Sequence, residues 1–361
     1  MTGRATDDLV ESVLAGEHRA LARAITTIEN RADGYRELVS ELHAHAGGAD
    51  VIGVTGSPGA GKSTLVDKMA AAYREDGLTV GVIAIDPSSP YTGGAVLGDR
   101  IRMGSNVGDM DVFFRSMSAR GSLGGLSTAT SDAVTALDAF GKDKVIIETV
   151  GAGQNEIDIV RTADSVAVLV PPGSGDDVQM LKAGILEIAD LFVVNKADLD
   201  GADRTVQELR ELVEYQQGSV PGDVGHHGAT AATVEGLEDG EEEEGWTPPI
   251  VETVANRDEG VEAVLDALSD HREFLAESGE GERQARTRYA EKVRTLLRED
   301  LNGLLADEID RQGGLDAYVD AVAAGETDPY SVADELIGPI ADCVERAGGV
   351  DERQTGPAAE D

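Results

Sequence analysis

Apolar residues along the chain follow two patterns, which alternate through its middle part. Short runs rich in β-branched residues, such as 51–55, are typical of strands that are buried on both faces of a sheet. Between them, apolar residues recur at every fourth position, as at Leu65, Met69 and Tyr73, which predicts amphipathic helices. The alternation predicts an α/β domain with a mainly parallel sheet and crossover helices. The predicted strands are 51–55, 78–85, 145–147, 166–170, 191–194 and 249–254.

The two flanks of this region carry helical periodicity without strand-like runs. Apolar positions from Leu9 to Ile28, and again at Leu38 and Leu42, predict two helical segments before Gly47-Gly48. Beyond residue 275, one apolar face over 283–305 precedes a break at Gly313-Gly314. Further helices are predicted over 315–324 and 330–347. The expected organisation is a helical extension (1–49), a central domain (50–275), a helical arm (276–347) and a disordered tail (348–361).

Residues 218–247 depart from this rhythm. They contain Pro221-Gly222, His226-His227 and the run Glu241–Glu244, with almost no periodic apolar positions. Such a composition cannot bury enough apolar surface to fold on its own. We expect an acidic surface loop inserted in the central domain.

The charge of the chain is strongly unbalanced. Its 361 residues include 69 acidic and 30 basic side chains, giving a net charge of −39, and only seven of the bases are lysines. A lysine-poor, acidic surface spread over the whole chain indicates adaptation to a salt-rich cytoplasm. Melting temperatures measured from low to molar KCl can test this interpretation. No basic stripe is present, so we expect no nucleic-acid partner.

Other features of the composition limit the class of protein. One cysteine, Cys343, excludes an internal disulfide and a multi-cysteine metal site. There is no apolar run of about eighteen residues, so we expect no membrane association and a cytoplasmic location. The sequence thus predicts a soluble protein with one large core.

The stretch directly after the first predicted strand carries a phosphate-binding signature. Residues 56–63 match the pattern G-x-x-x-x-G-K-[ST] at every fixed position, and a helix is predicted to follow. Glycines allow backbone N–H groups to surround phosphate oxygens at the positive end of that helix. The motif predicts a P-loop nucleoside triphosphatase. Its expected nucleotide-binding residues are Gly56, Ser57, Pro58, Gly59, Ala60, Gly61, Lys62, Ser63 and Thr64, with Lys62 reaching the β- and γ-phosphates and Ser63 reaching Mg²⁺.

A second motif identifies the base. Asn195-Lys196-Ala197-Asp198 follows the predicted strand 191–194 and fits the guanine-recognition pattern N-K-x-D. A carboxylate at Asp198 can accept hydrogen bonds from N1–H and the exocyclic amine of guanine, whereas adenine offers neither donor. Thr253-Val254-Ala255, after the next strand, is placed as the last base-contacting loop of a G domain. We therefore expect GTP and GDP as ligands.

Three acidic residues are candidates for Mg²⁺ and for the switch machinery. Asp86 and Glu148 each follow a predicted strand, where ligand-binding residues of parallel sheets gather. Glu148-Thr149-Val150-Gly151 stands where a D-x-x-G motif is usual, and the glycine N–H of that motif senses the γ-phosphate. Glu148 could hold a metal-bound water or orient the attacking one. Asp99, in a glycine-rich stretch, could bind the metal or cap a helix. The predicted catalytic residues are Lys62, Glu148 and Asp99, and the predicted metal ligands are Ser63, Asp86, Asp99 and Glu148.

Several stretches around these motifs carry a more specific likeness. They are 86–90, 92–94, 97–103, 120–125, 148–154, 176–179 and 182–185, together with 20–25 and 328–330. In these stretches the sequence resembles the methylmalonyl-CoA mutase-associated G proteins (the MeaB/ArgK family). The likeness covers nearly the whole chain except the loop 218–247.

The resemblance implies a GTPase chaperone for an adenosylcobalamin-dependent acyl-CoA mutase. Members of the family gate cofactor loading by GTP hydrolysis, protect the mutase, and form homodimers through C-terminal helices such as those of 283–347. The resemblance also places an additional switch at Gly173–Lys182. Gln154 resembles a water-orienting glutamine in chemistry only, because its offset from Gly151 differs.

Three other functions stay open at this point. A nickel-insertion GTPase would share the nucleotide site but needs Cys/His ligands, and Cys343 has no histidine close in sequence. An ATPase or kinase linked to amino-acid transport conflicts with the guanine motif. A scaffold that binds GTP without turnover would differ only in rate.

Overall fold

A computed structural model describes residues 3–86, 109–118, 125–149, 161–173, 186–218, 245–311 and 313–348. The chain divides into two compact units, residues 1–288 and 289–361, and each is described by itself. The predictions for Asp99, for Gly151, for most of the acidic loop 218–247, for most of the switch 173–182 and for the tail lie outside the described residues.

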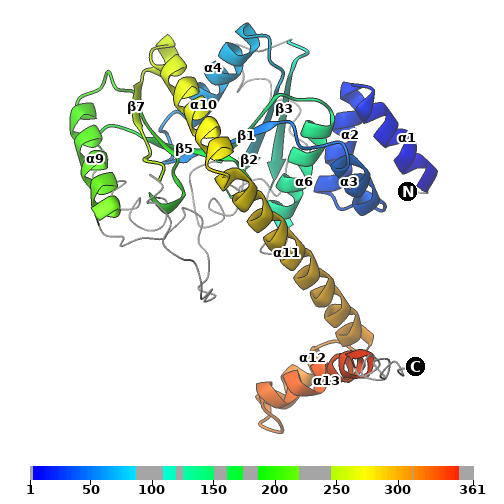
Figure 1. Cartoon of the computed structure of the whole chain (residues 1–361). Helices are drawn as coiled ribbons and strands as arrows, with labels where there is room; N and C mark the ends of the chain where they lie inside the picture. Colours follow the sequence, from blue (N-terminus) through cyan, green and yellow to red (C-terminus); the bar gives the residue numbers. More distant parts are fainter. Residues whose placement is uncertain are drawn as a thin grey trace, which may run out of the picture. The chain divides into compact units, whose positions relative to one another are not determined.

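Unit 1 is built on a seven-stranded, entirely parallel sheet (Figure 1). Its strand order is β3-β2-β4-β1-β5-β6-β7, so that the chain reverses direction across the sheet at β1. Such a switch point places ligands at the carboxyl ends of the central strands. The strands are β1 (Asp50–Gly56), β2 (Val80–Asp86), β3 (Val112–Ser118), β4 (Lys144–Glu148), β5 (Ser165–Val170), β6 (Leu191–Asn195) and β7 (Ile250–Thr253).

The six strands predicted from apolar runs are confirmed, with shifts at their ends. The sequence analysis missed β3, in which Arg115 and Ser116 interrupt the apolar pattern. Among the described strands, β3 pairs only with β2 and lies at the edge of the sheet, where such polar residues are tolerated. Its apolar residues still divide between the two faces of the sheet: Phe113 packs into one core, and Val112 and Phe114 into the other.

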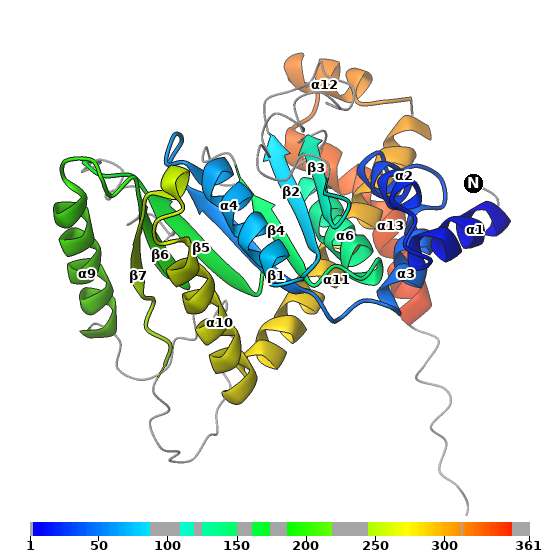
Figure 2. The ribbon, with the colours of Figure 1, turned by 90° about the horizontal axis from the view of Figure 1, so that it is seen from above.

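Helices cover both faces of the sheet (Figure 2). α4 (Lys62–Glu75) and α10 (Val261–Glu277) share one core with residues of the central strands. α6 (Gly125–Ala139) and α9 (Ala202–Gly218) pack into the core on the other face. The strands between them are almost completely buried, which explains their continuous apolar runs.

The N-terminal extension packs over α6. It forms three helices rather than the two predicted segments, because the chain turns at Gly16 with a φ of 82°. Many of their apolar residues are buried, among them Leu21, Ile25 and Leu42, and continue the core on that face of the sheet. The helices are α1 (Gly3–Leu14), α2 (His18–Glu29) and α3 (Tyr35–His43).

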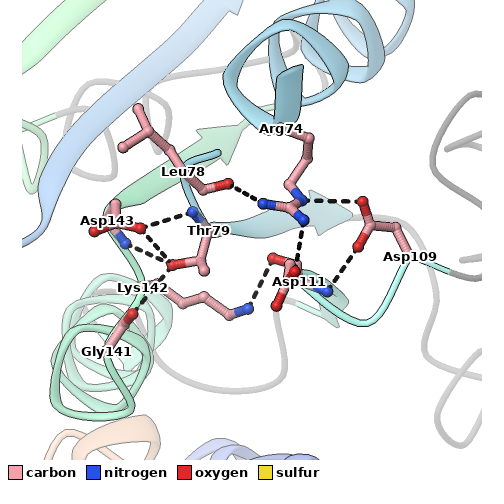
Figure 3. Close-up of polar contacts among 8 residues, drawn as sticks. All are labelled: Arg74, Leu78, Thr79, Asp109, Asp111, Gly141, Lys142 and Asp143. Atoms are coloured by element: carbon pink, nitrogen blue, oxygen red, sulfur yellow. Dashed lines mark hydrogen bonds and ion pairs between the residues drawn. The ribbon is translucent and has the colours of Figure 1, made fainter. Parts of the chain in front are cut away.

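A polar network ties together the elements at the amino edge of the sheet (Figure 3). Arg74, at the end of α4, contacts Asp109 at 2.9 Å and Asp111 at 2.5 Å, just before β3. Asp143, just before β4, accepts hydrogen bonds from the backbone N–H (2.7 Å) and the hydroxyl (2.8 Å) of Thr79. The backbone N–H of Asp111 and the Arg74 guanidinium together lower the pKa of Asp109. This network fixes the turns opposite the predicted nucleotide site.

A second buried group at the same edge joins the starts of β5 and β6 to α10. The Ser165 hydroxyl lies 2.7 Å from Nδ1 of His271, whose Nε2 is 3.4 Å from a carboxylate oxygen of Asp190. The indole of Trp246 packs on His271 and donates a hydrogen bond of 2.8 Å to the Asp190 carbonyl. The arrangement resembles a serine–histidine–acid triad in composition. Its side chains are at most 5% exposed, so we assign it a structural role.

The Asp190 carboxyl should make stability depend on pH. Burial raises its pKa to about 7, against a hydrogen bond from Val166 N–H that lowers it. A raised pKa adds stability that is fully present below the ordinary carboxyl pKa and is lost as the pH rises through about 7. Between pH 5 and pH 8, we expect the free energy of unfolding to fall by on the order of 2 kcal/mol more in the wild type than in Asp190→Asn. Denaturant unfolding followed by Trp246 fluorescence measures it.

The exposed Asp266→Asn on α10 is the matched control for that experiment. It should keep the pH dependence of the wild type. If Asp190→Asn keeps it as well, the buried carboxyl does not titrate as described.

One ion pair at this edge anchors the beginning of α11 (Glu280–Arg311). Arg288 contacts Asp164 at 2.6 Å and donates to the carbonyl of Ala163 at 3.2 Å. Asp164 in turn accepts a hydrogen bond of 3.0 Å from the backbone N–H of Val51 in β1. Burial raises the pKa of Asp164, and Arg288 opposes that shift. Arg288 thus connects α11 to β1 through one carboxylate.

Unit 2 contains the rest of α11, then α12 (Asp316–Ala323) and α13 (Pro329–Gly348). The three helices predicted beyond residue 275 are confirmed, with the break at Gly313-Gly314. α11 exposes a row of apolar side chains, each more than half accessible: Tyr289, Val293, Leu297, Leu301 and Leu304. In the part of the chain that is described, no helix is long and apolar enough to cross a membrane.

Candidate nucleotide-binding site

The predicted phosphate loop connects β1 to α4 at the carboxyl edge of the sheet, with residues 57–61 between the two elements. Two of its glycines are required by their surroundings. Gly56 has a φ of 131°, and a Cβ there would lie 2.1 Å from the Leu169 carbonyl oxygen of β5. Gly61 has a φ of 95°, and a Cβ there would lie 2.3 Å from Nδ2 of Asn195. The loop can therefore approach the neighbouring strands only without these side chains.

Lys62 and Ser63 begin α4, so they lie at its positively polarised end. The Lys62 side chain is buried, and its ammonium donates to the carbonyls of Gly56 at 2.6 Å and Ser57 at 2.9 Å. The loop and the lysine thus form one unit that concentrates N–H donors and positive charge. Such an arrangement is suited to binding phosphate.

Ser63 and Glu148 come together from α4 and β4. The Ser63 hydroxyl donates a hydrogen bond to the Glu148 carboxylate, which is buried at the end of β4. β4 is hydrogen-bonded to β1, and Val54 is the register partner of Glu148. A hydroxyl and a carboxylate are the oxygen donors that Mg²⁺ prefers, so the pair fits the predicted metal site. Among the described residues there is no group of three histidine, cysteine or acidic side chains that could hold a metal.

Asn195 joins the phosphate loop to the base-recognition elements. Its side chain is buried and donates to the carbonyl of Ala60 at 2.7 Å. The amide oxygen of Asn195 accepts from the Thr253 hydroxyl at 3.0 Å and the Ala255 N–H at 3.2 Å. Within the described residues, the side-chain hydrogen bonds of Asn195 all run to other parts of the site, so this side chain holds the loops in position.

Lys196 and Asp198 follow on the turn after β6. Lys196 has a φ of 62°, an uncommon conformation for a residue with a side chain, and its ammonium donates to the carbonyl of Gly59 at 2.7 Å. Asp198 makes a 3.1 Å ion pair with Arg257, which lies two residues after the Thr253–Ala255 stretch. The sequence analysis did not select Arg257. Its position two residues after Ala255 was the available signal.

The structure therefore brings together most of the predicted site residues. Residues 56–64, Glu148, Asn195, Lys196 and Asp198 and the stretch Thr253–Ala255 all lie at or beyond the carboxyl ends of β1, β4, β6 and β7. Asp86 is the last residue of β2, and its side chain lies outside the described part.

Comparison with known proteins agrees with this geometry. The family model described as "Methylmalonyl Co-A mutase-associated GTPase MeaB" matches residues 21–309. The chain belongs to the methylmalonyl-CoA mutase-associated GTPase family. This confirms the resemblance seen in the sequence, and this member of the family is a P-loop GTPase that binds a guanine nucleotide.

Several curated relatives of this GTPase cover most of its length. A protein of Pyrococcus abyssi that is named as a GTPase is 45% identical over 92% of this chain and 95% of its own. The GTPase ArgK of Escherichia coli is 34% identical over 81% of this chain and 84% of its own. The mouse protein named methylmalonic aciduria type A homolog, mitochondrial, is 30% identical over 82% of this chain and 70% of its own.

A solved structure supports the fold of the GTPase. The crystal structure titled as an LAO/AO transport system kinase matches with a TM-score of 0.65 at 24% identity. It covers 94% of this chain and 99% of that chain. Together with the parallel sheet, this match confirms the predicted P-loop α/β fold.

Proposed function

We propose that this GTPase is a chaperone of an adenosylcobalamin-dependent acyl-CoA mutase, most simply a methylmalonyl-CoA mutase, and that it gates cofactor loading by GTP hydrolysis. The observation that carries the proposal is the family match over residues 21–309, on a chain whose phosphate and base motifs meet at one edge of the sheet. The mouse relative, whose name refers to methylmalonic aciduria, supports the same client.

In this proposal the phosphate loop and Lys62 hold the β- and γ-phosphates of GTP. Ser63 and Glu148, together with Asp86 and Asp99, would hold Mg²⁺, which neutralises charge on the phosphates during transfer. The contact between Ser63 and Glu148 supports this assignment because it joins the first turn of α4 to the end of β4. Glu148 is also the candidate that orients the attacking water, and Gly151 the one that senses the γ-phosphate.

For the base, Asp198 would accept both donors on the Watson–Crick edge of guanine. Asn195 would keep the loop 253–255 at a fixed distance from the phosphate loop. Its contacts with Ala60, Thr253 and Ala255 support that role, since one amide links three segments. Lys196, which contacts Gly59, would line the path between base and phosphates.

The coupling to the mutase can be tested by GTPase assays with the purified cognate mutase. The proposed switch starts at Gly173, after β5, at the same edge of the sheet as the phosphate loop. Coupling between two ligands is reciprocal for binding, so a mutase that prefers one nucleotide state must change the relative affinities for GTP and GDP. Through the proposed switch, we expect it to change turnover as well. We expect slow basal hydrolysis that rises on addition of mutase. Replacing Asp176 and Asp177 by alanine, together with Lys182→Ala, should erase the rise and spare the basal rate.

The double variant Asp266→Ala/Asp270→Ala removes two carboxylates from the exposed face of α10 and is the control for the two aspartates. It should retain the stimulation. Equal rates with and without mutase would reject the chaperone function and leave a GTPase with another client.

We further propose that the protein is a homodimer through its C-terminal helices. The supporting observation is the row of apolar side chains on α11, each more than half accessible. A contiguous apolar surface of this kind often marks a protein–protein contact. Replacing Leu297 and Leu301 by glutamate should convert dimer to monomer in sedimentation velocity. Leu199→Glu is the matched control, because Leu199 is as exposed as Leu301, at 54% each, but lies in unit 1. A monomeric wild type would contradict the proposal.

A further inference from the structure

An open cavity lies where α2, in the N-terminal extension, meets the edge strand β3. It is lined by Arg19, Ala22, Arg23, Thr26, Thr27 and Arg115, with a volume of about 330 Å³. It is widely open to solvent, so a ligand there would be held mainly by the charged side chains around it. Three of its six lining residues are arginines.

The cavity is separate from the nucleotide site. β3 is removed from β1 by β2 and β4 in the sheet, which corresponds to roughly 14 Å at the usual strand spacing. Phe113, two residues before Arg115 and so on the same side of the strand, packs into the core that α6 and the extension share. α4, which carries Lys62, packs on the other face of the sheet. The upstream stretch 20–25, which contributes Arg23, holds none of the predicted nucleotide-site residues.

The charge in the cavity is unusual for this chain. Acidic residues outnumber basic ones by 69 to 30, so an exposed arginine would be expected to find a carboxylate easily. Arg19 and Arg23 are exposed and have neither an ion pair nor a hydrogen bond within the part of the chain that the structure describes. Arg115 alone is paired, with Glu29 at 2.8 Å. The three guanidinium groups and the Glu29 carboxylate together carry a local charge of about +2, because arginine stays protonated in proteins.

The remaining groups favour an oxyanion. Arg115 donates to the Thr26 hydroxyl at 3.2 Å, and its buried Nε has no acceptor among the described residues. Arg19, Arg23 and Thr26 follow one another along one side of α2, at positions i, i+4 and i+7. Guanidinium groups bind planar pairs of oxygens in a forked geometry, which suits phosphate groups better than isolated carbonyls.

We propose that Arg19, Arg23 and Arg115 form a second anion site, which takes a small molecule carrying a phosphate or diphosphate group. The local charge matches a dianionic phosphate, and the volume admits the group together with a small part of the molecule that bears it. The site would make this GTPase responsive to a phosphorylated metabolite as well as to its own nucleotide.

Calorimetric titration of the full chain with inorganic pyrophosphate tests the proposal. Saturating GDP fills the nucleotide site, and free Mg²⁺ is held constant. We expect one saturable pyrophosphate site per chain in the wild type. Arg19→Ala/Arg23→Ala should weaken it at least tenfold. Both side chains are exposed, so this variant should fold, as the melting temperature and unchanged GDP affinity will show.

The double variant Arg204→Ala/Arg210→Ala is the matched control. It removes the same charge from exposed positions of α9. It should bind pyrophosphate within about twofold of the wild type, because α9 contacts β6 and β7, at the opposite end of the sheet from β3, and salt screens charges over that separation. Equal weakening in both variants would assign the effect to net charge and overturn the site. Absence of pyrophosphate binding in the wild type would overturn it too. Saturable binding of a hexaglutamate peptide without pyrophosphate binding would replace the small ligand by an acidic protein segment. None of these outcomes depends on a mutase, so the result is independent of the chaperone proposal.

Discussion

Lys62→Ala is expected to abolish tight binding of GTP. The ammonium lies at the start of α4 and is buried among the loop carbonyls of Gly56 and Ser57. The other ammonium of the described site, that of Lys196, is bound to the carbonyl of Gly59 and does not replace it at that position. Charge-assisted hydrogen bonds contribute about 1.5–3 kcal/mol each, so losing one or two should weaken GTP by roughly a hundredfold or more. Fluorescence titration with a labelled GTP measures the loss, and GDP should lose less because it lacks the γ-phosphate.

Lys68→Ala provides the control for this variant. Lys68 lies on the same helix and makes a surface ion pair with Asp258 at 2.9 Å. It removes the same charge but should leave GTP affinity within about twofold, since surface pairs contribute little. Binding of guanosine reports whether the Lys62→Ala site is still folded. If Lys62→Ala binds GTP as tightly as Lys68→Ala does, the phosphate assignment is wrong.

Asp198→Asn should change the preferred base from guanine to xanthine. The carboxylate can accept two hydrogen bonds from guanine, whereas the amide offers one acceptor and one donor, and the donor can pair with the 2-oxo group of xanthine. Sites that pair every polar group of a ligand discriminate strongly against mismatched analogues. We expect the ratio of GTP to XTP affinity to fall by a hundredfold or more. Competition titrations with the two nucleotides give the ratio directly.

Asp200→Asn is the matched control, because Asp200 is an exposed carboxylate two residues further along the same turn. Its preference for GTP should equal that of the wild type. A wild-type preference in Asp198→Asn would mean that another group reads the base. Arg257→Ala separates the two roles of Asp198, since it removes the partner at 3.1 Å and keeps the carboxylate. It should weaken GTP less than Asp198→Asn does.

Sequence patterns predicted those parts of the molecule in which a local rule agrees with the fold. The buried strands were visible because both faces of the sheet are covered, and the phosphate loop because its glycines and lysine follow a fixed spacing. The edge strand β3 was not visible, because its exposed position tolerates Arg115 and Ser116. The helix break at Gly16 was also missed, since apolar spacing continues on both sides of it.

Within the site, residue types could be predicted but their contacts could not. The sequence identified Asn195 as part of a base motif, yet its three bonds to Ala60, Thr253 and Ala255 depend on strands that pair only in the folded sheet. Arg257 belongs to no motif, and it reaches Asp198 only because β6 and β7 are neighbours. The arginine cavity likewise combines a helix near the start of the chain with a strand almost ninety positions later.

The ion pair of Arg288 with Asp164 has a consequence for where the chain can be shortened. A truncation just before Arg288 would leave the half-buried Asp164 carboxylate without its cation. The same carboxylate accepts the hydrogen bond from the Val51 N–H of β1. Removing one partner of a desolvated pair costs far more than the pair contributes. A minimal GTPase should therefore end a turn or more beyond Arg288, within α11. Cut there, the nucleotide-binding half can be studied alone, without Leu297, Leu301 and Leu304 of the apolar row.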